Sequence, residues 1–489
     1  MRLTPLLKMA IGTGAALLVF TVAPATTASA TPSTFVPCSS GAAGLIAAIN
    51  AANGSGGGTI SLAWGCTYAL TAPDNGENGL PVVKTPISVF GNGATITGSG
   101  AVRIFEVDGP GGNLSLRNVT LTGGSASDFG GAILNSSGTV RLNQSVVTGN
   151  SAAMAGGGIA SGTFGPSTAM LTLNGTLVTN NSSGVGGGIV NVQGTATLNF
   201  SRVANNFAGA FAGGGIASGD YNMGPPFSPG PTSQLTLNFS QVNNNTAPNA
   251  GGGGIQNLAG NVTVNVSQVN GNTSLNGGGI ASGNGAGGGP GGPPPGTSSL
   301  TIFFSQVNGN TSTAPIPAPG TGPPIAAGGI ANGGSAFITG SEVENNTATT
   351  ISGAGIVNHG TMTINWSEVN HNTAAGTGGT ASGGGILNAS AGPGTNPPSG
   401  VLTINFSQVN GNSAGGFGGG ILNGLPSPKM PATGTLTLNH SQVNGNSAGL
   451  GGGGIYSVVG GVVSLTSTSV NGNHPDNCEP LASIAGCTG

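Results

Sequence analysis

One stretch of sequence decides how this chain folds: Leu235-Thr-Leu-Asn-Phe-Ser-Gln-Val-Asn-Asn-Asn245, followed by small residues and then by Gly251-Gly-Gly-Gly-Ile255. The unit recurs eleven times, and each copy closes on an asparagine. The closing asparagines are Asn150, Asn181, Asn206, Asn245, Asn272, Asn310, Asn346, Asn372, Asn412, Asn446 and Asn473. Their shortest spacings are 25 to 27 residues, a period typical of units that bury an apolar face only by stacking on copies of themselves.

Apolar residues occupy fixed positions in every copy. Valine stands three residues before each closing asparagine, Leu, Ile or Val stands eight before it, and an apolar residue stands ten before it. The last two positions alternate with Thr or Asn, the period-two pattern of a strand with one buried face. Each copy adds an inward isoleucine after its glycines, as at Ile255. We therefore expect an all-β solenoid with three short strands per coil.

The closing asparagine itself predicts a sharp corner between strands. Asparagine tolerates the left-handed backbone conformation, and its amide bonds readily to nearby backbone groups. Stacked at a rung spacing of about 4.8 Å, such amides can also bond to one another in a ladder. We expect this column to be structural and not to bind a ligand.

The repeats resemble those of chlamydial polymorphic membrane proteins, which pair Gly-Gly-Ala-Ile with Phe-x-x-Asn. Gly130-Gly-Ala-Ile133 matches the first motif, and Val-x-x-Asn stands in place of the second, over roughly residues 120–475. More broadly, the chain resembles the parallel β-helix proteins of the pectate-lyase-like superfamily. This resemblance implies a right-handed parallel β-helix (solenoid), commonly begun by a short capping helix.

The two ends of the chain differ from the repeats. Residues 1–30 read as a cleaved signal peptide, with an apolar run and a small-residue cleavage site at Ala28-Ser29-Ala30. No later stretch is apolar for the roughly 20 residues that span a bilayer, so we expect no membrane span and an extracellular protein, released or held non-covalently at a cell surface. Residues 31–125 form an N-terminal cap and the first irregular coils, 126–474 the regular repeats, and 475–489 a C-terminal cap.

Within the N-terminal cap we expect a helix from Ser40, as its N-cap, to about Asn53. Its apolar face is composed of Ala42, Leu45, Ile46 and Ile49. Inserts rich in proline and glycine interrupt the regular repeats at Tyr221–Pro231, Gly283–Gly296, Thr313–Pro324 and Ala391–Ser399.

The four cysteines lie at the ends of the chain: Cys38, Cys66, Cys478 and Cys487. In an oxidising compartment this spacing favours two local disulfides, although four cysteines allow three pairings. The spacing of cysteines and histidines is not that of a metal site, and we predict no metal and no cofactor.

Charge is scarce: the 489 residues include 8 Lys and Arg and 11 Asp and Glu. A nucleic-acid partner is excluded, because so few cations cannot form the basic patch that neutralises phosphates. The 98 glycines and 31 prolines approach the composition of a disordered chain, but their periodic placement argues for the repeat fold.

Catalysis on a polysaccharide needs converging carboxylates. Glu342 and Glu368 occupy one position in consecutive repeats, where other copies have glutamine, and we expect a solvent-facing polar column. The remaining candidates are Asp220 in an insert and the N-terminal charges, which we expect to be loop charges and salt bridges of the cap. We therefore predict no catalytic residue. The N-terminal charges are Asp74, Glu77, Lys84, Arg103, Glu106, Asp108, Arg117 and Asp128.

Six residues before each closing asparagine lies a column of mixed residues, here named the aromatic column. Its members are Gln144, Gly175, Phe200, Phe239, Val266, Phe304, Gly340, Trp366, Phe406, His440 and Ser467. We expect these side chains to pack at a corner, and stacking on sugar rings is the alternative. An outward column of threonines has the flat hydroxyl array of ice-binding solenoids, although threonine is ordinary on exposed strands. Its members include Thr236, Thr263, Thr301, Thr363, Thr403 and Thr437.

These features predict a secreted, non-catalytic β-helix protein of a surface or matrix, binding a polysaccharide or cell-surface glycan as an adhesin does. The alternative is an extracellular polysaccharide lyase or glycoside hydrolase acting on acidic polysaccharide, with its site in the inserts and early coils. The fold alone does not choose between them.

Overall fold

A computed structural model describes residues 32–162, 168–219, 232–283, 298–313, 326–349, 353–376, 381–389, 400–426, 432–481 and 484–487. The expected signal peptide lies outside the described residues, and so do Tyr221–Pro231, Ala391–Ser399 and most of the two inserts between them. Among the described residues, no helix is long and apolar enough to cross a membrane.

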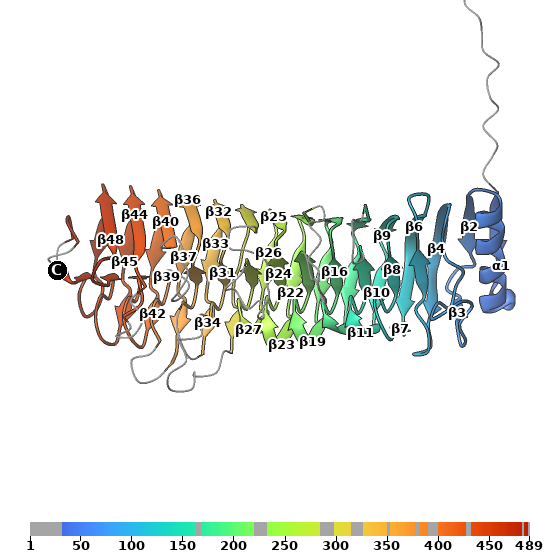
Figure 1. The fold of residues 1–489 in the computed structure, drawn as a ribbon, viewed down its shortest axis with the longest axis horizontal. Helices are drawn as coiled ribbons and strands as arrows, with labels where there is room; N and C mark the ends of the chain where they lie inside the picture. Colours follow the sequence, from blue (N-terminus) through green and yellow to red (C-terminus); the bar gives the residue numbers. More distant parts are fainter. Residues whose placement is uncertain are drawn as a thin grey trace, which may run out of the picture. The chain divides into compact units, whose positions relative to one another are not determined.

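Most regular coils contain four short strands, as in β21 (Gln234–Asn238), β22 (Gln241–Asn243), β23 (Thr246–Gly251) and β24 (Ile255–Leu258). Each strand pairs in parallel with its counterpart in the next coil, and Figure 1 shows the coils following one another in sequence order. The expectation of three strands per coil was wrong in one detail. A left-handed residue between β21 and β22, Phe239, breaks the first side of the coil into two strands.

The core is formed by the apolar positions that the repeat predicted. Leu235 is the Cα partner of Val262, Leu237 of Val264, and Ile255 of Ile280. Equivalent side chains therefore stack on one another from coil to coil, and those of the core are almost completely buried. This arrangement confirms the parallel β-solenoid, while its right-handed sense stays a prediction.

The closing asparagines form the predicted ladder inside the coils. Asn245 Nδ2 donates to Asn272 Oδ1 at 3.0 Å and to the Val203 carbonyl at 3.0 Å, and the Asn245 backbone N–H donates to the same Oδ1 at 2.9 Å. The left-handed conformation, however, belongs to the preceding residue, such as Asn244 at φ 57° or Gly271 at φ 65°. The turn is made one residue early because the closing asparagine must point its amide inward.

The N-terminal end has the predicted helix. Helix α1 (Gly41–Gly54) buries Leu45, Ala48, Ile49 and Ala52 and contacts β1 (Ser33–Val36), β2 (Gly58–Leu62), β3 (Thr67–Ala69) and β4 (Pro86–Thr97). The predicted N-cap bond is absent in this described segment: the Ser40 hydroxyl donates to the Pro37 carbonyl at 2.8 Å instead.

The disulfides Cys38–Cys66 and Cys478–Cys487 are both formed, as the local pairing predicted. At the C-terminal end, β50 (Cys478–Glu479) pairs with β47 (Ile455–Ser457). Disulfides persist in oxidising compartments, so these two are consistent with an extracytoplasmic location.

Candidate functional site

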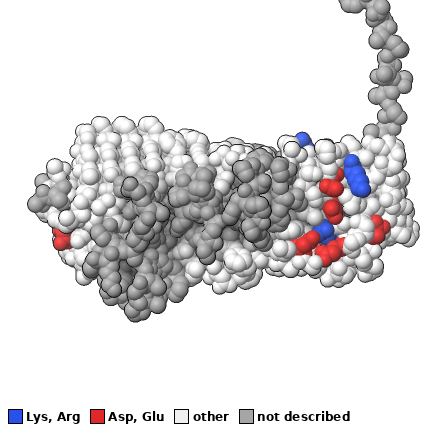
Figure 2. Space-filling view, in the orientation of Figure 1, with Lys and Arg blue, Asp and Glu red and all other residues white. Residues whose placement is uncertain are grey.

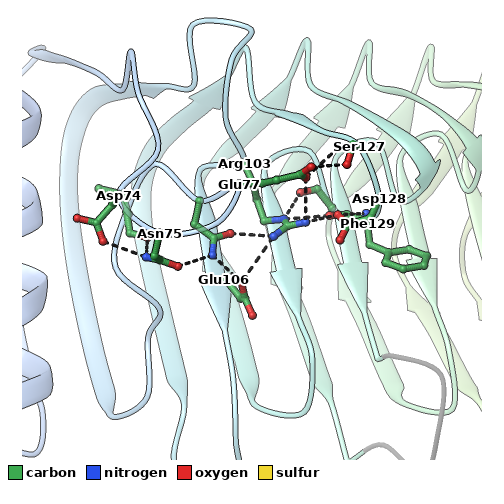
Figure 3. A network of polar contacts seen from close by, with 11 residues as sticks. Asp74, Asn75, Glu77, Arg103, Glu106, Ser127, Asp128 and Phe129 are labelled. Atoms are coloured by element: carbon green, nitrogen blue, oxygen red, sulfur yellow. Dashed lines mark hydrogen bonds and ion pairs between the residues drawn. The ribbon is translucent and has the colours of Figure 1, made fainter.

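Near the N-terminal end, the buried side chain of Arg103 lies at the centre of a cluster of charged and polar groups (Figure 3). Only 4% of this side chain is exposed. Its Nε donates to the carbonyl oxygens of Phe129 and Gly130, at 3.0 and 3.2 Å, and its Nη1 donates to Asn78 Oδ1 at 2.8 Å. The chain itself thus satisfies the donors of this buried cation, as burial of a charge requires.

Three carboxylates surround the same guanidinium. Glu106 Oε2 lies 3.6 Å from Nη1, Glu77 Oε2 lies 3.8 Å from Nη2, and Asp128 pairs with Nη2. Hydrogen bonds from Ser127, with a smaller contribution from the charge of Arg103, hold the pKa of Glu77 below its ordinary value. The cluster therefore ties together the segments that contain Glu77, Arg103, Glu106 and Asp128.

The remaining N-terminal charges are dispersed. Asp74 joins the Arg103 cluster indirectly, since Asn75 Nδ2 donates to its Oδ2 at 2.9 Å. Lys84, Asp108 and Arg117 take part in no ion pair among the described residues. In the view of Figure 2 the charged side chains gather at this end.

Glu342 and Glu368 lie on adjacent coils, as the sequence predicted. Strand β33 (Glu342–Glu344) pairs with β37 (Glu368–Asn370), and the two glutamates are Cα partners. Gln306 Nε2 donates to Glu342 at 2.9 Å, and Asn370 Nδ2 donates to Glu368 at 3.0 Å. They are members of a column of hydrogen-bonded amides and carboxylates. Asp220 lies outside the described residues, and within the described ranges no three His, Cys, Asp or Glu are placed to hold a metal ion.

The aromatic column lies on the outward side of the 21-stranded sheet, at the break between two strands of each coil. Its residues are left-handed, with φ from 45° to 59°. The exposed fractions are 69% for Phe200, 54% for Phe239, 63% for Trp366 and 51% for Phe406. The expectation of packing into a corner was therefore wrong for these aromatic residues: the left-handed turn aims them away from the body of the coil.

The exposed rings pack on one another instead. Phe200 and Phe239 are stacked with centroids 5.1 Å apart and planes 9° apart. Trp366 and Phe406 stack at 5.7 Å, and Phe406 and His440 at 4.9 Å. Such stacks hold flat apolar surfaces in fixed positions facing solvent.

A groove of about 590 Å³ opens in front of the Phe200–Phe239 stack. It crosses β4, β6 (Asn113–Thr122), β9 (Thr139–Asn143) and β13 (Met170–Asn174). Phe90 and Phe200 contribute aromatic walls, and Arg117 is the titratable side chain of the lining. The lining residues are Ser88, Val89, Phe90, Ser115, Arg117, Asn143, Gln144, Asn174, Gly175 and Phe200.

Three exposed arginines lie on the outward side of this sheet, in its N-terminal coils. Arg117 is the Cα partner of Phe90 and Asn143, and Arg141 is the partner of Ser115 and Thr172, so the two exposed arginines lie on the same side. Exposed Arg202 follows in β18 (Arg202–Ala204), beside Phe200 in the sequence. The described strands of these N-terminal coils contain no Asp or Glu on this side. The glutamates that do lie on it, Glu342, Glu344 and Glu368, belong to β33 and β37, several coils further along.

Sequence reasoning placed Arg117 among the cap charges and did not connect it with the aromatic column. The available signal was the alternation of inward and outward residues, which puts Arg117 and Arg141 on the side opposite the buried leucines. The column also contained glycine at Gly175, which marked the place where the groove opens.

Comparisons with known proteins show no family for this chain. No protein-family model matches the chain, and no curated protein matches it, so the likeness to chlamydial polymorphic membrane proteins has no support from them. A similar solved structure is the A-module of the mannuronan C-5 epimerase AlgE6 of Azotobacter vinelandii. The TM-score is 0.45 and the identity 13%, over 88% of this chain and 95% of that one.

Proposed function

We propose that this chain is a secreted, non-catalytic protein of a cell surface or matrix that binds an anionic glycan on the outward side of its 21-stranded sheet. The observation that supports this most is the exposed stack of Phe200 and Phe239 at the edge of the groove. An aromatic face covers the apolar face of a sugar ring, while amides and hydroxyls beside it bond to the ring's edge.

Charge favours an acidic over a neutral saccharide. Arg117 lines the groove, and a guanidinium pairs with a carboxylate through two parallel hydrogen bonds. Arg141 and Arg202 add two cations to the same side of a chain whose formal net charge is −3. The arginines therefore attract an acidic polymer that the protein as a whole repels.

Binding without turnover follows from the same lining. The described residues of the groove include no carboxylate and no histidine, so they supply no pair of groups for general acid and base catalysis. The carboxylates of Glu77, Glu106 and Asp128 form ion pairs with Arg103 and do not line the groove.

The test is a glycan array of neutral, uronate-bearing and sulfated oligosaccharides, followed by calorimetry on the best ligand. The double change Phe200→Ala and Phe239→Ala is expected to weaken binding about tenfold, equivalent to about 1.4 kcal/mol. Phe211→Ala, at an equally exposed phenylalanine of β19 (Phe207–Ala212) in another sheet, is the matched control and should leave affinity unchanged.

Arg117→Gln is expected to weaken binding of the acidic ligand and to flatten its salt dependence, with little effect on a neutral one. Lys84→Gln removes the same charge from an exposed lysine outside the groove and serves as its control. Absence of binding to every saccharide, or release of unsaturated or reducing ends from a bound polymer, would overturn the proposal.

A further inference from the structure

The aromatic column has an empty position at Gly175. Its backbone has the same left-handed conformation as its neighbours, with φ 56° against 50° at Phe200 and 49° at Phe239. Phenylalanine occupies this conformation in the next two coils, so the backbone does not demand glycine here. A Cβ added at Gly175 would meet Gln144 Cγ at 3.8 Å, an ordinary van der Waals contact, so there is room for a side chain at this position.

One face of the Phe200 ring borders that space. Its other face is covered by Phe239, one coil further along, whereas Gly175 occupies the preceding coil and provides no side chain. Gly175 and Phe200 both line the groove. Adjacent rungs are about 4.8 Å apart, so a ring lying at the level of Gly175 would continue the stack at nearly the spacing of Phe200 and Phe239.

The second glycine of the column, Gly340, has the space of its missing side chain occupied by a neighbouring ring. At Gly340, φ 59°, an added Cβ would lie 2.6 Å from the ring of Phe304. The ring from the neighbouring coil therefore already fills the place of a side chain at Gly340, whereas at Gly175 the neighbouring Gln144 leaves room for one.

A polarised row of amides ends at the same place. Asn174 Nδ2 donates to Asn143 Oδ1, and Asn199, Asn238 and Asn265 continue the row, each with a bond of 2.9 Å in the same sense. Aligned amides strengthen one another, so the N–H end of the row is its best donor. That end is Asn143 Nδ2, which lines the groove and has no acceptor among the described residues.

We infer that Gly175 is the floor of a socket for one hexuronate ring, which enters the column as a missing side chain would. The ring stacks on the free face of Phe200, and its carboxylate or a hydroxyl oxygen accepts from Asn143 Nδ2 and Arg117. The inference rests on the proposed glycan-binding function and goes beyond it, because it names one inserted ring as the recognised unit.

Filling the socket is the direct test. Gly175→Phe adds a ring to a column that already has phenylalanine at four positions, and it is expected to weaken binding of hexuronic acid oligosaccharides, one to six residues long, at least about tenfold. Gly340→Phe makes the same change at the covered position and should keep affinity within about twofold of the wild type. Circular dichroism and thermal unfolding of both variants check that the coils remain folded.

Asn143→Asp supplies a second variant that does not depend on the added ring. The aspartate still accepts from Asn174, but it replaces the free donor with a negative charge. We expect hexuronate binding to fall at least about tenfold, and binding of neutral oligosaccharides to change less.

The outcomes distinguish the socket at Gly175 from the proposed glycan binding in general. Undiminished hexuronate binding by folded Gly175→Phe would refute the socket while leaving glycan binding in place. A wild-type chain that binds no oligosaccharide overturns the proposed function and the socket together. Equal losses in Gly175→Phe and Gly340→Phe would show that the column acts as a continuous surface without a socket.

Discussion

At the scale of single residues, His359 shows how the stacked coils treat a polar side chain in their interior. Its Nδ1 lies 2.8 Å from the Ala389 carbonyl, to which it donates, and Nε2 has no hydrogen-bond partner among the described residues. Burial lowers the pKa of His359 to about 4, only partly offset by the bond to Ala389. The folded chain therefore holds a neutral imidazole at pH values where the unfolded chain binds a proton.

This histidine predicts an acid-sensitive stability. Above pH 6.5, His359 is neutral in the folded and in the unfolded chain, so it adds no pH dependence to stability. As the pH falls from 6.5 to about 4, His359 gains a proton only in the unfolded chain. The folded state should lose up to about 3 kcal/mol over that range. Urea unfolding at several pH values measures the loss.

His359→Val serves as the control, because Val192 and Val458 occupy the equivalent place in other coils. The difference in unfolding free energy between wild type and His359→Val should shift with pH between 6.5 and 4. A difference in unfolding free energy that does not change with pH would contradict a buried, neutral imidazole at His359.

At the scale of single elements, the closing asparagines act as the links between coils. Asn272 shows the pattern. Its Nδ2 donates to Asn310 Oδ1 in the next coil at 3.0 Å and to the Val242 carbonyl at 2.8 Å, and its Oδ1 accepts from the backbone N–H of Asn245 in the preceding coil. The closing asparagines other than Asn473 are buried, so removing one of these side chains leaves several polar atoms without partners and away from water. The ladder therefore stabilises the stack more than a surface column of the same residue type.

Asn272→Ala is expected to destabilise the chain by at least about 3 kcal/mol, since it strands the Asn245 N–H and the Val242 carbonyl. The midpoint of urea unfolding followed by circular dichroism measures it. Asn261→Ala, at the half-exposed start of β25 (Asn261–Asn265), is the matched control and should cost less than about 0.5 kcal/mol. Similar costs at the two sites would show that the ladder is not a major source of stability.

At the scale of the whole described solenoid, each coil contacts mainly its two neighbours, so stability is a sum of local terms and the ends are the weak points. Helix α1 and β1 cover the first coil, and the Cys38–Cys66 disulfide ties that cover to the turn after β2. The Cys478–Cys487 disulfide closes a shorter loop at the other end.

Replacing Cys38 and Cys66 by alanine is expected to cost about 3–4 kcal/mol, because the bond closes a loop over a sequence separation of 28 residues. Hydrogen exchange should accelerate in α1 and β2 and stay unchanged in central strands such as β21. The paired alanine changes at Cys478 and Cys487 are the control: their loop spans a separation of 9, so they should cost less and loosen only the C-terminal end. Acceleration spread evenly over all coils would contradict this nearest-neighbour view.

The sequence by itself determined the periodic parts of this protein. Residues such as Leu235, Val242 and Ile255 recur at fixed spacing, and an apolar side chain in a repeat of this length has no burial other than the next copy. The amide ladder and both disulfides were likewise predictable, because each joins positions that are equivalent in the repeat or close in the chain.

Only the tertiary structure decided which departures from the repeat come together as the candidate binding site. Arg117, Asn143, Gly175 and Phe200 lie in four successive coils of unequal sequence, and their alignment depends on strand register and on the left-handed turns between strands. A corner residue points into the body or into solvent according to its backbone dihedral angles, which composition does not specify. The exposed rings, the open position at Gly175 and the free end of the amide row follow from that geometry.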